Sequence, residues 1–193
     1  MTFSGSAAST MRSDAVSNRL RVVAAGARVF SEQGVEATLN DVARAAGVGV
    51  ATVYRNFPNR DALLDGLFQM KLDQLVELAD RAADIAEPSS AFNTYLYSVM
   101  EAHAIDRGVV PVLMRATQSA QFAKELAAQL GPRVQPLIVA AQSAGSLRDG
   151  FTIQDLCLLA AMVGSVADLT RATQPALWKR YAQMLIDGTR PPV

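Results

Sequence analysis

The chain has 193 residues, half of them hydrophobic and 6% aromatic, a composition that favours packed helices over a β-sandwich. Its 18 basic and 18 acidic side chains balance overall, but residues 1–60 hold seven arginines against four acids, and this small positive surplus is typical of a segment that meets phosphate. A single cysteine, Cys157, excludes an internal disulfide, and because we find neither a secretory signal nor an uncharged run of roughly 20 residues, we expect a soluble, cytoplasmic protein.

The chain begins with a polar stretch that precedes the first predicted helix. Residues 1–13 are small and polar, and we expect them to form a disordered tail. Apolar residues at spacings of three and four then predict a helix over residues 14–33, which Gly34 ends. The apolar face of this helix is expected to comprise Leu20, Val23, Ala24, Ala27 and Phe30.

Two short helices are predicted next, over residues 39–46 and 50–56. Thr38 provides a hydroxyl that can accept from an unpaired amide of the first, and an acid stands three residues later. Gly47 separates the two helices, and Pro58 prevents the second from continuing. The pattern predicts a helix-turn-helix.

The remainder of the chain is also predicted to be helical. Asn59 caps a long helix that runs until Pro88. No stretch shows the period-two alternation of strands, so we predict an all-α fold of about nine helices, with a three-helix domain over residues 14–60 and a helical body over residues 61–193. Helices in that body are predicted over residues 90–106, 109–117, 119–130, 132–145, 152–172 and 175–188.

Two short helices that meet at a glycine turn can cross at a steep angle only if their facing residues are small. Ala43, Ala46 and Gly47 meet this requirement. Apolar contacts to the flanking helices are expected from Val42, Val48, Val53 and Phe57. The outward residues of the second short helix are polar or small, which is typical of a helix that enters the DNA major groove; they are Gly49, Val50, Ala51, Thr52, Tyr54, Arg55 and Asn56.

The segment from Leu20 to Leu64 resembles the TetR family of transcriptional regulators. Three positions depart from the family pattern: Gly26 replaces an alanine, Gly49 a frequent serine, and Arg60 a frequent lysine. The pattern itself is carried by Thr38, Val42-Ala43, Ala46-Gly47-Val48, Thr52-Val53-Tyr54, Phe57, Arg60 and Leu63-Leu64.

The resemblance implies a sequence-specific regulator that binds double-stranded DNA. Base contacts are expected from Asn40, Val50, Ala51 and Thr52, with Val50 and Ala51 able to meet thymine methyl groups. Core packing is an alternative for Tyr54, and a solvated surface role is one for Arg55 and Arg60. Phosphate contacts are expected from Thr38, Thr52, Tyr54, Arg55, Asn56 and Arg60.

The resemblance also implies that the helical body binds a small molecule and forms a homodimer. The stretch from Leu156 to Ala167 is apolar nearly all round, more than a single neighbouring core requires, although it could instead be the internal core of a monomer. The expected dimer interface comprises Leu156, Ala160, Ala161, Gly164, Trp178, Tyr181 and Leu185.

The expected ligand pocket is the least specific prediction, because methionines and aromatics at helical spacing also build ordinary cores. It comprises Tyr95, Val99, Met100, His103 and Met114, with a hydrogen-bonded role in the core or at the surface as the alternative for the histidine. With one histidine and one cysteine, no metal site and no cofactor is indicated.

We therefore expect a dimeric repressor that an unidentified small-molecule effector releases from a palindromic operator. An effector-independent DNA-binding dimer is one alternative. The other is an all-α enzyme, which is disfavoured because no nucleophile, acid pair or phosphate loop can be assembled and no catalytic residue can be named.

Overall fold

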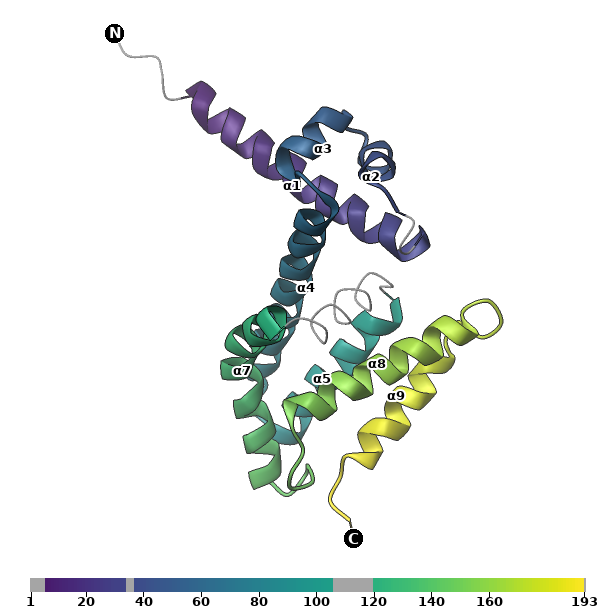
Figure 1. Ribbon diagram of the computed structural model, residues 1–193. Coiled ribbons are helices and arrows are strands. Elements are labelled where there is room, and N and C mark those ends of the chain that lie inside the picture. Colours follow the sequence, from purple (N-terminus) through teal and green to yellow (C-terminus); the bar gives the residue numbers. More distant parts are fainter. Residues whose placement is uncertain (1–5, 34–36, 106–119, 193) are drawn as a thin grey trace. The chain divides into compact units, whose positions relative to one another are not determined.

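The computed structural model describes residues 6–33, 37–105 and 120–192, and within these ranges the secondary structure is entirely helical, with eight helices (Figure 1). The predicted all-α fold is thus confirmed. The chain divides into two compact units, Met1–Met70 and Lys71–Val193. The division lies ten residues beyond the boundary expected from the sequence, because the first turns of the fourth helix complete the core of the N-terminal unit: Leu63 and Leu67 are fully buried there.

The N-terminal unit contains α1 (Ser6–Gln33), α2 (Leu39–Ala46), α3 (Val50–Asn56) and the beginning of α4 (Arg60–Ala83). Helix α1 starts at Ser6, whereas the sequence predicted a disordered tail through residue 13. Residues 6–13 include two alanines, a methionine and an arginine, which are good helix formers, so the helix can extend through them. Residues 1–5 lie outside the described part of the chain.

Helix α1 buries a wider and rotated face compared with the prediction. Val23, Ala27 and Phe30 are buried as expected, but Leu20 and Ala24 are exposed. The reason is that α1 packs against both α2 and the start of α4: a Cβ placed on Gly26 would lie 3.3 Å from Leu63 Cδ2. The additional buried residues of this face are Val22, Ala25 and Val29.

Local caps define the two short helices. The Thr38 hydroxyl accepts the Asp41 N–H at 3.2 Å, and the Asp41 carboxylate accepts the Thr38 N–H at 3.1 Å, which completes a capping box at the start of α2. Gly47 ends α2 with a left-handed φ of 65°, a conformation that glycine adopts without steric cost. Three residues separate α3 from the end of α2, and Phe57 caps the C-terminus of α3.

The C-terminal unit consists of the rest of α4 with α5 (Pro88–Ile105), α7 (Ala120–Ser143), α8 (Ile153–Thr170) and α9 (Leu177–Gly188). Helix α5 is its centre and packs against α7, α8 and α9 (Figure 1). Helices α5 and α8 approach closely at Gly164, where a Cβ would stand 3.3 Å from the His103 carbonyl oxygen. The predicted helix over residues 109–117 falls outside the described residues.

Helix α7 runs without interruption through Gly131 and Pro132, where the sequence predicted a break between two helices. Pro132 and Pro136 each remove one intrahelical hydrogen bond, a cost of about 3 kcal/mol for a proline in a helix interior. Tertiary packing offsets this cost, because the buried stripe of the helix continues across both prolines. It comprises Leu130, Val134, Leu137, Ile138 and Ala141.

Helix α8 is long and apolar enough to pass a length-and-composition test for a membrane span. One such helix is weak evidence for a membrane span, and 28% of this stretch is buried, where α8 packs against α5, α7 and α9. Its buried residues face these neighbours: Leu156, Ala160, Val163, Gly164 and Ala167.

Candidate nucleic-acid interface and apolar cavity

Helix α3 presents a mostly small and polar face to solvent, as the sequence predicted. Its inner side is anchored by Val53, while Phe57 directly after the helix is also fully buried. On the outer side Val50 and Tyr54 are 44% and 47% exposed, and Arg55 is exposed as well. The exposure of the tyrosine argues against its alternative role in the core and leaves its ring and hydroxyl accessible to a nucleic acid.

Two other polar residues of α3 are engaged locally. The Thr52 hydroxyl accepts a hydrogen bond from Arg55 Nη2 at 3.0 Å, and Asn56 Nδ2 donates to the Thr52 carbonyl at 2.8 Å. Both bonds join residues three or four positions apart, and the one to the hydroxyl lies at the surface, so a phosphate oxygen can replace the acceptor of Arg55 at small cost.

Thr38 acts in the structure as a helix cap. Its hydroxyl donates to Asp41 Oδ2 at 2.5 Å while accepting the Asp41 N–H, so its only proton is already used. These hydrogen bonds hold the pKa of Asp41 below its ordinary value. Thr38 therefore stabilises the start of α2. To donate to a phosphate, its hydroxyl would have to give up the hydrogen bond to Asp41. Asn40, the second residue of α2, is exposed, as is Ala51 in α3.

Arginines of α1 hold the ends of the two short helices, a role that the sequence reasoning did not identify. Arg21 Nη2 donates to the Ala46 carbonyl at 3.0 Å, and Arg28 Nη2 donates to the Ala45 carbonyl at 3.3 Å, both at the end of α2. Arg19 Nη1 likewise donates to the Asn56 carbonyl at the end of α3, at 3.0 Å. Cations suit helix C-termini, where carbonyl groups lack intrahelical partners.

Two further contacts of arginines involve aromatic rings. The guanidinium of Arg19 lies 4.3 Å from the centre of the Phe57 ring, and that of Arg60 lies 4.9 Å from the centre of the Phe30 ring. Arg60, predicted to meet phosphate, is exposed and thus packs its charged group on α1 while leaving part of it accessible. Most arginines of this unit therefore contact other parts of the unit itself. Arg44 is a further exposed arginine, which the prediction omitted.

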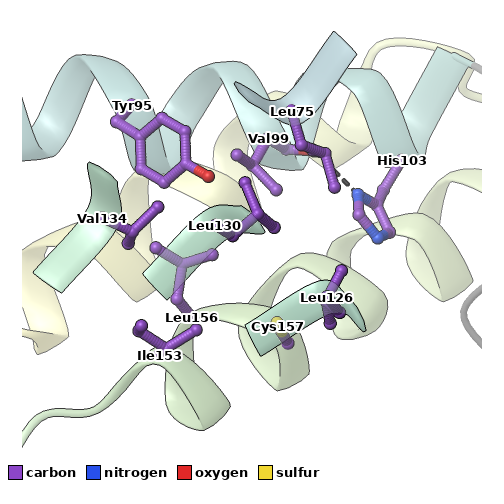
Figure 2. Close-up of a pocket in the computed structure, with 10 residues that line it drawn as sticks. All are labelled: Leu75, Tyr95, Val99, His103, Leu126, Leu130, Val134, Ile153, Leu156 and Cys157. Carbon is purple, nitrogen blue, oxygen red and sulfur yellow. Dashed lines mark hydrogen bonds between the residues drawn. The ribbon is translucent and has the colours of Figure 1, made fainter. Parts of the chain in front are cut away.

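The C-terminal unit encloses a narrow apolar cavity against α5. Figure 2 shows Tyr95, Val99 and His103, three of the residues expected in a ligand pocket, along one side of it. Met100 is fully buried but does not line the cavity, and Met114 lies outside the described residues. The space open to a water-sized molecule is about 10 Å³, which holds about one water. The remaining lining residues, which the sequence reasoning missed, are Leu75, Leu126, Leu130, Val134, Ile153, Leu156 and Cys157.

The polar groups at this cavity sit in apolar surroundings. Burial raises the pKa of the Tyr95 phenol, with a smaller contribution from Cys157, and burial likewise raises the pKa of the Cys157 thiol. His103 Nδ1 lies 2.8 Å from the Val99 carbonyl, which can only accept, so this nitrogen carries a proton. Among the described residues, no three histidine, cysteine, aspartate or glutamate side chains gather where they could hold a metal ion.

The outer faces of α8 and α9 expose large apolar side chains. Met162 and Leu158 of α8 are 53% and 56% exposed, and Met184 of α9 is 56% exposed. An open groove of about 480 Å³ runs between the start of α8 and the end of α9. Of the residues predicted for a dimer interface, Tyr181 is exposed and Ala161 and Leu185 are half-buried. The others lie in the core of the protomer, because they face α5: Leu156, Ala160, Gly164 and Trp178.

Two family profiles match the chain. One, described as bacterial regulatory proteins of the tetR family, matches residues 22–67. The other, described as the C-terminal domain of SbtR-like transcriptional regulators, matches residues 87–191, more than half of the chain. The chain belongs to the TetR family. It is thus a DNA-binding transcriptional regulator of a non-enzymatic family, and the alternative of an all-α enzyme falls away.

Individual TetR-family relatives agree with this placement. An HTH-type transcriptional regulator of Staphylococcus aureus is 34% identical over 67 residues, 34% of this chain and 36% of the relative, so the chain spans about a third of the length of the curated relative it matches. A TetR transcriptional regulator of Streptomyces coelicolor has a similar structure with 27% identity, a TM-score of 0.64, and 91% and 99% of the two chains covered.

A third comparison shows the fold alone. The regulator FadR of Bacillus subtilis, solved in complex with stearoyl-CoA, is 17% identical with a TM-score of 0.66, and the match covers 88% of this chain and 98% of FadR. The two chains thus share the fold at low sequence identity.

Proposed function

We propose that this protein is a dimeric repressor that a small-molecule effector releases from a palindromic operator. The observation that carries the proposal is the cavity against α5, where the hydroxyl of a buried tyrosine faces an otherwise largely aliphatic lining in the unit that does not contain the helix-turn-helix. An effector that favours the state unable to bind DNA would shift the population away from the operator-bound state.

The DNA-binding surface is proposed to be the outer face of α3 with the start of α2. Val50 and Ala51 would meet thymine methyl groups, while Asn40 and Thr52 would reach base edges. Phosphates would be met by Tyr54, Arg55, Asn56 and Arg60 on either side of the groove, with Arg44 added from the structure and Thr38 contributing chiefly through its cap.

The dimer is proposed to form through the exposed face of α8 and α9 rather than through the set predicted from the sequence. Leu158, Met162, Tyr181 and Met184 are exposed there, and an apolar surface of this kind on neighbouring helices is typical of a subunit interface. Palindromic operators follow from such two-fold pairing, since each subunit presents one recognition helix.

Selection of bound sequences from random DNA tests the first part of the proposal. We expect enrichment of a palindrome with half-sites about one helical turn apart, and failure to enrich any palindrome contradicts it. Release of a labelled copy of that palindrome is then measured against a library of metabolites, where at least one compound should dissociate the complex.

Subunit pairing is tested by sedimentation of variants. Met162→Arg places a charge on the exposed face of α8 and should give monomers, which bind the palindrome at least tenfold more weakly because each subunit then holds only one half-site. Val139→Arg is the matched control: Val139 is 48% exposed on α7, and its replacement should leave the dimer intact. A Met162→Arg dimer would place the interface elsewhere.

The effector-independent dimer remains a second candidate, favoured by the small volume of the cavity. A cavity with about 10 Å³ open to a water-sized molecule admits no metabolite without movement of its walls. If no compound in the library dissociates the operator complex or raises the melting temperature of the protein, this second candidate replaces the first.

A further inference from the structure

We propose that the cavity against α5 takes an uncharged, largely apolar molecule with one hydroxyl or carbonyl group, and that the Tyr95 hydroxyl hydrogen-bonds to this group. The inference rests on the proposed function, because it names the chemical class of the effector.

The lining of the cavity argues against a charged ligand. Seven of the ten lining residues are aliphatic, and the other three are Tyr95, His103 and Cys157. The described lining therefore contains no aspartate, glutamate, lysine or arginine. A carboxylate or ammonium group that entered would lose its water without gaining an opposite fixed charge, which is strongly unfavourable.

Tyr95 supplies the polar contact. Its side chain is 1% exposed, and Figure 2 shows its oxygen pointing into the space between Leu130 and Val99. Among the described residues no hydrogen bond of this hydroxyl is found, and it does not belong to the fully buried polar atoms that lack a partner, so it is open to the cavity space. Buried hydroxyls in proteins normally have partners, because burial without one costs free energy. A ligand oxygen at this place would give the hydroxyl a hydrogen-bond partner.

The other polar positions of α5 agree with a neutral ligand. Tyr95, Val99 and His103 follow one another at intervals of four residues on a single face, so the stripe extends over about 12 Å. Because His103 Nδ1 donates to the Val99 carbonyl, Nε2 carries a lone pair when the ring is neutral. An apolar chain that lies along Val99 would span the distance between the two polar residues.

Helix α7 can provide the space that a ligand needs. Leu126 and Leu130 line the cavity before Gly131-Pro132, and Val134 lines it directly after. Prolines in helices remove backbone hydrogen bonds and permit bending at their position. A change of bend at this point would move the three side chains away from α5 without loss of the helix on either side.

Three eight-carbon molecules with different head groups test the ligand class with the full-length protein. 1-Octanol, octanoate and octylamine are compared at pH 7.5 by titration calorimetry and by thermal shift. We expect 1-octanol to bind and to raise the melting temperature, and the two charged molecules to bind at least tenfold more weakly. Tyr95→Phe should weaken 1-octanol about tenfold, as expected when a buried hydrogen-bonding group loses its partner.

Two controls keep the test decisive. Tyr97→Phe removes the hydroxyl of the other tyrosine of α5, which packs near Trp178 rather than at the cavity, and should leave the affinity for 1-octanol unchanged. Without ligand, Tyr95→Phe should melt no lower than the wild type, because it removes a hydroxyl without a partner. A lower melting temperature would mean that the folded protein already satisfies this hydroxyl, and this would overturn the inference.

The remaining outcomes separate the ligand class from the proposed function. Binding of none of the three molecules, tighter binding of octanoate or octylamine, or an unchanged affinity of Tyr95→Phe for 1-octanol overturns the ligand class. Release of the operator by a charged metabolite overturns the ligand class and leaves the proposed function standing. Binding of 1-octanol without release of the operator by it or by any library compound supports the ligand class and contradicts the proposed function.

Discussion

Arg19 connects α1 to the end of the recognition helix, and replacing it by alanine tests how that helix is held. Its Nη1 donates to the Asn56 carbonyl at 3.0 Å, and its guanidinium carbon lies 4.3 Å from the centre of the Phe57 ring. Helix α3 has only seven residues, too few to be stable by itself, so its position depends on contacts with its neighbours. Arg19→Ala removes two of them at once.

The magnitude follows from the two contacts. A cation at an exposed helix C-terminus contributes about 0.3–1 kcal/mol, and an exposed cation–π contact about 0.5–1 kcal/mol. We therefore expect Arg19→Ala to lower the free energy of unfolding by about 1–2 kcal/mol, as measured by urea denaturation followed by circular dichroism. Arg19→Lys should recover only part of this loss. An ammonium group is not planar, so it cannot stack on the Phe57 ring and donate to the Asn56 carbonyl at the same time.

Operator affinity distinguishes a clamp from a phosphate contact. If Arg19 orients α3, Arg19→Ala should weaken operator binding several-fold while the dependence of affinity on salt concentration keeps its slope. A slope reduced by about one unit would show a phosphate contact instead. Arg81→Ala is the control, since Arg81 is an exposed arginine of α4 whose pair with Glu77, at 3.7 Å, contributes little. A loss of stability below about 0.5 kcal/mol for Arg19→Ala would refute the reasoning.

Three further predictions concern the C-terminal unit and are measured by urea unfolding. Gly164→Ala should cost about 1–3 kcal/mol, because its Cβ would meet the His103 carbonyl at 3.3 Å, and unchanged stability would show that α5 and α8 can separate freely. Gly131→Ala should stabilise by about 0.5–1 kcal/mol, since no atom lies within 4 Å of the added Cβ; a loss would contradict a helix there. The pKa of Asp155 is lowered chiefly by the Thr152 hydroxyl, so its contribution is present above about pH 4 and is lost as the pH falls further. Asp155→Asn should remove that part of the acid dependence, and an unchanged pH profile would exclude it.

The sequence alone was sufficient for the helix-turn-helix and for the family. The caps and stops of α2 and α3 act within three or four residues, so Thr38, Gly47 and Pro58 announce the helix ends without reference to the rest of the chain. The inward places of Val53 and Phe57 follow from the same local spacing. Long amphipathic segments such as α4 are predictable for a similar reason, because a stripe of leucines repeats with the helical period.

Only the tertiary structure decided the features that depend on distant parts of the chain. Gly131 and Pro132 predict a break between two helices when only their neighbours in the sequence are considered. In the structure α7 continues through both residues, because it packs against α5. Apolar character alone did not show whether Ala160 and Gly164 face a second subunit or the same protomer; α5 occupies that side. The tertiary structure likewise decided that Tyr95 lines a cavity, because the other lining side chains come from four different helices. Helix caps and stops depend on residues that are neighbours in the sequence and can be predicted from it. Burial depends on which helices pack together, and only the tertiary structure shows this.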